Sequence, residues 1–95
     1  VFTRRGKVVV RNARYRDDHR PIEENCGCYV CRNYTRAYLR HLFNAGEVLG
    51  ARLGTWHNLH FYLEMMRDAR RAVAEEKFGA FRDRFLEEFE SGETQ

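Results

Sequence analysis

The sequence predicts a small α+β domain in which short antiparallel strands come first and helices follow. A β-branched run lies within the first twelve residues, and helical periodicity occupies most of the chain after residue 35. The chain has 95 residues, which is enough for one domain but too few for a (β/α)8 barrel of about 200 residues or more. Its 43% hydrophobic and 14% aromatic content excludes a wholly disordered chain.

The strands are expected near the amino terminus. Residues Lys7–Asn12 contain three consecutive valines, which favour an extended strand. Phe2–Thr3 is the expected partner strand, and Arg5-Gly6 is the expected turn between the two.

Two helical segments are expected next. The first begins near Thr35, a residue type that caps helix amino termini, and Gly46 ends it. The second covers residues 47–54, and we expect Gly50 and Gly54 to interrupt it because glycine is a poor helix former.

The last two helices have the clearest periodicity. One presents an apolar face at steps of three and four residues: Leu59, Tyr62, Leu63, Met66, Ala69 and Val73. The other runs from Lys77 to Glu90 with a stripe that we expect to be buried: Phe78, Phe81, Phe85 and Phe89. The acidic residues 87–95 are expected to fray.

Three cysteines occur within six residues, at Cys26, Cys28 and Cys31. A bridge between the first two would close a strained ring, and three thiols cannot all pair. Clustered thiols without a secretory signal favour metal binding. The alternatives are a redox pair at Cys28 and Cys31, which lacks its usual βαβ frame, and three free thiols in a turn.

Zinc prefers four tetrahedral ligands from cysteine and histidine. A fourth ligand to the cysteine loop must therefore come from elsewhere, and spacing alone leaves four candidates open: His19, His41, His57 and His60. A site with four protein ligands would be structural, because no position remains for substrate.

Charge supports a second class of function. Residues 1–20 carry seven basic side chains against two acidic ones, although the whole chain has a net charge of only +3. A stand-alone zinc module that binds RNA or a protein is therefore an alternative. No stretch reaches the roughly 18 apolar residues of a membrane span and no signal peptide is visible, so we expect a cytoplasmic protein.

An ordered set of motifs then identifies a family resemblance. The motifs are Phe2-Thr3-x-x-Gly6, Arg11-Asn12-Ala13-x-Tyr15, Pro21-Ile22, Cys26-x-Cys28-Tyr29-x-Cys31, Asn33-Tyr34-x-Arg36-Ala37-Tyr38-Leu39-x-His41-Leu42, Glu47-x-Leu49 and Thr55-x-His57-Asn58-Leu59-x-Phe61-Tyr62. With these motifs in this order, the chain resembles the carboxyl-terminal region of bacterial tRNA-guanine transglycosylase, also called queuine tRNA-ribosyltransferase, over roughly residues 1–90.

The resemblance implies a fold and a set of metal ligands. The family forms a (β/α)8 barrel that carries a small zinc subdomain near its carboxyl end. Residues 1–57 would be this zinc-binding subdomain, and residues 58–95 would be helices that complete the barrel and its flank. The implied ligands of one structural Zn²⁺ are Cys26, Cys28, Cys31 and His57.

The resemblance also implies activity and partners. The family exchanges guanine at the tRNA wobble position for a 7-deazaguanine base, preQ1 in bacteria, during queuosine biosynthesis. One aspartate attacks the ribose and a second acts as general acid and base. Family members form homodimers through surfaces around the zinc subdomain and the helix after it. Tyr34, Tyr38 and His41 form one stripe on that helix, which suits either such an interface or internal packing.

No catalytic residue is expected in these 95 residues. Both family aspartates would lie before Val1, and the four aspartates of the chain occur in a different context: Asp17, Asp18, Asp68 and Asp83. The chain also begins without an initiator methionine. We therefore expect it to be part of something longer or a processed product.

Overall fold

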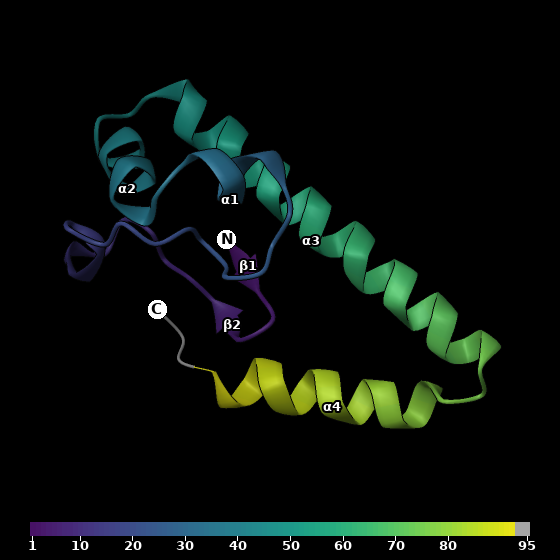
Figure 1. Cartoon of the computed structure of the whole chain (residues 1–95). Coiled ribbons are helices and arrows are strands. Elements are labelled where there is room, and N and C mark those ends of the chain that lie inside the picture. Colours follow the sequence, from purple (N-terminus) through teal and green to yellow (C-terminus); the bar gives the residue numbers. More distant parts are fainter. Residues whose placement is uncertain (93–95) are drawn as a thin grey trace.

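The computed structural model describes residues 1–92, which form a small helical domain with two short antiparallel strands, consistent with the α+β prediction (Figure 1). The described elements in order are β1 (Phe2–Thr3), β2 (Gly6–Lys7), the 3-10 helix η1 (Ala13–Tyr15), α1 (Tyr29–Asn33), α2 (Arg36–Asn44), α3 (Val48–Ala74) and α4 (Phe78–Ser91). The long helix α3 is the axis of the molecule. The hairpin, α1 and α2 gather at its first half, and α4 folds back from its end.

The strand prediction was correct for the pairing and wrong for its extent. Phe2 lies opposite Lys7 and Thr3 opposite Gly6, so the turn is Arg4–Arg5 and not Arg5-Gly6. Gly6 belongs to β2 and has a φ of 110°, which side chains other than glycine rarely adopt.

The valine run does not continue the strand to Asn12. The backbones of Val1 and Val8 exchange hydrogen bonds of 2.8 and 2.9 Å, and the chain then turns, with the Asn12 N–H donating to the Val9 carbonyl. The β-branched run is used for burial instead, because the side chains of Val8 and Val10 pack with Tyr15 in a small core cluster.

The predicted start of α2 is confirmed. The Thr35 side chain caps the helix by accepting a hydrogen bond of 3.1 Å from the Tyr38 N–H. The helix buries Leu39 and Leu42, and the chain leaves it through Gly46, whose φ is 72°. Helix α1, five residues long, was not predicted.

The predicted interruption at residues 47–54 was wrong, because α3 runs unbroken from Val48 to Ala74. A Cβ atom on Gly50 would lie 3.1 Å from the Leu42 Cβ and 3.2 Å from the Phe43 nitrogen. Gly54 faces the ring of Phe43 at 3.2 Å in the same way. These glycines therefore allow α2 and α3 to approach closely. The expected boundary between the zinc-binding subdomain (residues 1–57) and the carboxyl-terminal helices (residues 58–95) lies inside this helix.

The main core lies between α1, α2 and the first half of α3. Its buried members are Ile22, Cys28, Val30, Leu39, Leu42 and Leu53, with Cys26 and Cys31 packed at its edge. The cysteine loop is therefore part of the hydrophobic core.

The predicted apolar face of α3 is helical but mostly uncovered. Leu59, Tyr62, Leu63, Met66 and Val73 are between 43% and 59% exposed. Helix α4 matches the predicted range closely, but its phenylalanine stripe is less buried than expected. Phe78 is 41% exposed, and Phe81, Phe85 and Phe89 are half-buried in a ladder of rings that contacts Phe61 of α3. Residues 87–91, which we expected to fray, are helical, and residues 93–95 lie outside the described part of the chain.

Within residues 1–92, no helix is both long and apolar enough to cross a bilayer.

Candidate metal centre

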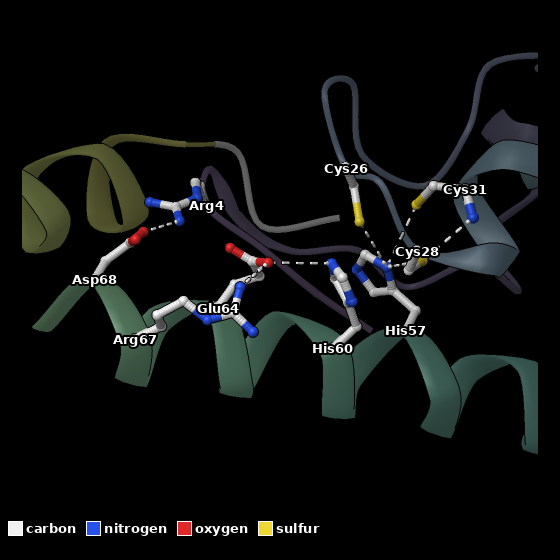
Figure 2. Close-up of polar contacts among 9 residues, drawn as sticks. All are labelled: Arg4, Cys26, Cys28, Cys31, His57, His60, Glu64, Arg67 and Asp68. Carbon is white, nitrogen blue, oxygen red and sulfur yellow. Dashed lines mark hydrogen bonds and ion pairs between the residues drawn. The ribbon is translucent and has the colours of Figure 1, made fainter. Parts of the chain in front are cut away.

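Four side chains from three parts of the fold meet at one point (Figure 2). Cys26 lies in the loop before α1. Cys28 is the N-cap residue of α1, Cys31 lies within α1, and His57 lies on α3. The His57 Nδ1 is 3.8 Å from the Cys26 Sγ, 3.5 Å from the Cys28 Sγ and 3.4 Å from the Cys31 Sγ. All four donor atoms lie within 4.8 Å of one another.

Local backbone geometry presents the three sulfurs on one side. Asn25, which tolerates the left-handed conformation better than most residues, has a φ of 67° and redirects the chain into the loop. Cys28 caps α1, and its sulfur accepts a hydrogen bond from the Cys31 N–H at 3.3 Å. One helical turn then separates Cys28 from Cys31, so both side chains lie on the same face.

The donor set and its dimensions fit zinc. Zinc binds thiolate sulfur at about 2.3 Å and imidazole nitrogen at about 2.0–2.1 Å, so the edges of a tetrahedral site are roughly 3.5–3.8 Å long. The three sulfur–nitrogen distances of 3.4–3.8 Å agree with these edges. The arrangement could therefore hold one metal ion, with no ligand position left for a substrate.

A backbone carbonyl fixes the orientation of His57. Its Nε2 lies 2.7 Å from the Phe2 carbonyl oxygen, and the residue is fully buried. A carbonyl can only accept a hydrogen bond, so the proton of the neutral ring lies on Nε2. The lone pair of Nδ1 is then directed at the three sulfurs, as a metal ligand requires.

Burial changes the proton affinity of three of the four side chains. Desolvation raises the pKa of the Cys26 and Cys31 thiols and lowers the pKa of the His57 imidazole. A metal ion that binds here must therefore displace protons from these two thiols. A bound metal cation would balance the negative charge of the resulting thiolates and would join the cysteine loop to α3.

A family profile described as "TGT: Queuine tRNA-ribosyltransferase" matches residues 1–91 of the chain. The chain belongs to this family. Curated relatives with the same description are 54% identical over 85 residues in Herminiimonas arsenicoxydans, 53% over 91 in Helicobacter pylori and 48% over 90 in Fusobacterium nucleatum. These alignments cover 90%, 96% and 95% of the chain but only 23–24% of each relative. The chain therefore spans about a quarter of the length of these queuine tRNA-ribosyltransferases.

The other three histidines are not part of this four-residue cluster. His60 lies one turn after His57, but its Nε2 faces the Glu64 carboxylate at 3.8 Å (Figure 2). His19 and His41 are exposed. Of the four candidates that spacing left open, the structure brings His57 to the sulfurs.

The side chains expected to form either a dimer surface or an internal packing face lie together near the metal centre. Tyr34 and Tyr38 stack with their ring centroids 5.6 Å apart, and exposed His41 follows on the next turn of α2. Sequence reasoning missed two aromatic side chains that adjoin this cluster, Tyr29 and Trp56, whose rings stack at 5.0 Å and which are 41% and 52% exposed. Only the contact between α1 and α3 brings these two rings together, so no periodicity could have revealed it.

A partly buried arginine, whose role the sequence did not indicate, stabilises the approach to the cysteine loop. Arg36 at the start of α2 donates to the carbonyls of Pro21 and Ile22 at 3.0 and 2.7 Å. It also lies 3.6 Å from Asp18, which pairs with Arg20 at 2.8 Å. These bonds hold residues 18–22 against α2, and the chain enters the metal loop from there.

Proposed function

We propose that this chain is the carboxyl-terminal, zinc-binding part of a tRNA-guanine transglycosylase. The whole enzyme would exchange guanine at the wobble position of tRNA for a 7-deazaguanine base, preQ1, in the cytoplasm. The observation that carries the proposal is the convergence of three cysteines and His57 in a chain whose family match covers residues 1–91.

The role of this part is structural. Cys26, Cys28, Cys31 and His57 would hold one Zn²⁺, which ties the loop to α3 and supplies folding free energy. The site has no open ligand position, so the chemistry of base exchange would belong to aspartates elsewhere in the enzyme. Residues 1–57 would serve as the zinc subdomain, and residues 58–95 would complete the barrel and its flank.

The uncovered face of α3 supports such a larger enzyme. Leu59, Leu63, Met66 and Val73 follow steps of four, three and seven residues along one side of the helix and are 43–59% exposed. A contiguous apolar stripe of this kind usually contacts another structure. We propose that the remaining three quarters of the enzyme, as a (β/α)8 barrel, covers it.

The aromatic cluster around α2 supports a homodimer. Tyr29, Tyr34, Tyr38 and Trp56 form a partly exposed patch beside the metal centre, and tyrosine and tryptophan are enriched at protein interfaces. His41 extends the same face of α2. Replacing Tyr38 with arginine in the whole enzyme should shift native mass spectra from dimer to monomer, and an unchanged dimer would exclude this surface.

A stand-alone module that binds RNA is not favoured. Several basic side chains of the first twenty residues already face acids: Arg4 pairs with Asp68, Arg16 with Asp17 and Arg20 with Asp18. Phosphates would have to compete with these contacts. The family match and the uncovered α3 face both favour an enzyme part instead.

A chimera tests the proposal. The chain would replace the matching quarter of the Herminiimonas arsenicoxydans relative, and exchange of labelled guanine into tRNA would be measured. We expect the chimera to be active and the isolated chain to be inactive. Introducing His57→Ala should destabilise the chimera and release zinc, whereas the control His60→Ala should behave as the parent. A zinc-loaded, folded chimera without exchange activity would contradict the proposal.

A further inference from the structure

We propose that Asn58 is a positioning residue of the metal centre, which acts by holding the Phe2 carbonyl against His57. The proposal rests on the zinc site and goes beyond the functions proposed above. It assigns a task to a side chain that lies next to a ligand in sequence but is directed at the strand β1.

The contacts form a short chain from Asn58 to the metal site. The Phe2 N–H donates to the Asn58 Oδ1 at 2.8 Å, and the Phe2 carbonyl accepts from the His57 Nε2–H at 2.7 Å. Both polar groups of one strand residue are therefore bound by two consecutive residues of α3. The bond to Asn58 orients the backbone of β1 at Phe2, and the bond from His57 fixes the orientation of the imidazole ring.

The identity of the residue at position 58 agrees with this role. Asparagine is unfavourable in a helix interior because its side chain competes for backbone hydrogen bonds. Asn58 lies in the middle of the 27-residue helix α3, and its side-chain oxygen is used by a strand 56 residues away. A long-range bond of this kind explains a residue that helix propensity alone would disfavour.

The rest of the hairpin is held independently of Asn58. The Arg4 N–H donates to the Glu23 carboxylate at 2.7 Å, and the Arg4 guanidinium pairs with Asp68 of α3 at 2.5 Å (Figure 2). Loss of the Asn58 bond should therefore leave the hairpin in place and loosen β1 mainly at Phe2. Partners of ligating histidines keep the ring and its tautomer in place, and their loss commonly weakens metal binding.

The test compares zinc affinity, by chelator competition, in Asn58→Ala, Asn58→Asp and the parent chain. Asn58→Ala removes the acceptor, and we expect about three- to tenfold weaker zinc binding from the loss of one exposed hydrogen bond. Asn58→Asp keeps an acceptor oxygen and should stay within about twofold of the parent. Thr55→Ala, at an exposed site one turn earlier on α3, is the control for alanine itself.

Helix propensity separates positioning from general stability. Alanine is the better helix former, so Asn58→Ala should not weaken α3 itself. Imidazole nitrogen NMR of the zinc-loaded chain gives a second readout: exchange of the His57 Nε2 proton should be faster in Asn58→Ala than in Asn58→Asp. Equal zinc affinity and equal proton exchange in the two variants would overturn the proposal. Absence of zinc binding by the parent chain would instead overturn the site itself.

Discussion

Gly50 is predicted to be a site where a single methyl group destabilises the protein. In an exposed helix, replacing glycine with alanine stabilises by about 1 kcal/mol. At Gly50, the new Cβ would lie 3.1 Å from the Leu42 Cβ, 3.2 Å from the Phe43 nitrogen and 3.3 Å from the Leu42 carbonyl carbon. Two of these atoms are backbone, so α2 and α3 must move apart, and overpacking of this kind costs about 1–3 kcal/mol.

The net effect of Gly50→Ala is therefore a loss of about 1 kcal/mol, or roughly 5 °C in melting temperature for a domain of this size. Gly79 in α4 provides the matched control, because its Cβ would meet nothing within 4 Å. Gly79→Ala should stabilise by a few tenths to about 1 kcal/mol.

Thermal and urea unfolding of the zinc-loaded chain, followed by circular dichroism, measures both variants. Gly50 lies two turns before His57 on α3, so the same displacement should weaken zinc binding in Gly50→Ala and leave it unchanged in Gly79→Ala. Stabilisation of both variants by similar amounts would refute the close approach of α2 and α3.

Three further predictions concern the hydrogen bonds of Asp18 and Arg36 and the proposed ligand Cys28. The Arg20 side chain, which hydrogen-bonds Asp18, lowers the pKa of Asp18 from 3.8 to about 2. The ionised Asp18 carboxylate therefore stabilises the fold fully above pH 4, and this stabilisation is lost as the pH falls towards 2. Asp18→Asn should cost about 1–2 kcal/mol of folding stability at pH 7. Carboxyl NMR should give the low pKa of Asp18 directly. Arg36→Lys should cost about 1–3 kcal/mol in urea unfolding, because lysine cannot donate to both the Pro21 and Ile22 carbonyls and also reach Asp18. Cys28→Ser should abolish tight zinc binding in a chelator assay, and retention of zinc would exclude Cys28 as a ligand.

Much of the local structure could be predicted from sequence because single residues determine it. Thr35 indicates the start of α2, and the phenylalanine stripe indicates α4. The spacing of the three cysteines by itself indicates a metal site. In each case, the signal lies within one or two helical turns or one loop.

The remaining features depend on contacts that no local pattern contains. From sequence alone, Gly50 and Gly54 are expected to interrupt a helix. In the structure, they lie within the continuous helix α3 and allow α2 to pack closely against it. Spacing could not choose among four histidines, because the choice depends on where α3 crosses the cysteine loop. The apolar face of α3 was interpreted correctly as a helix face, but periodicity cannot say whether its partner lies in the same 95 residues.

The carbonyl of Phe2 illustrates the same limit at the metal centre. A backbone group carries no signature in the sequence, yet it decides which nitrogen of His57 faces the sulfurs. Family resemblance could select His57, but only the folded hairpin supplies the reason for its orientation.

Native mass spectrometry of the purified chain and of two histidine variants tests the central claim most directly. After equilibration with zinc and a weak chelator, the parent and His60→Ala should each carry one zinc per chain, whereas His57→Ala should carry none. A metal-free parent chain, or a His57→Ala variant that retains its zinc, would contradict the assignment of Cys26, Cys28, Cys31 and His57 as one structural zinc site.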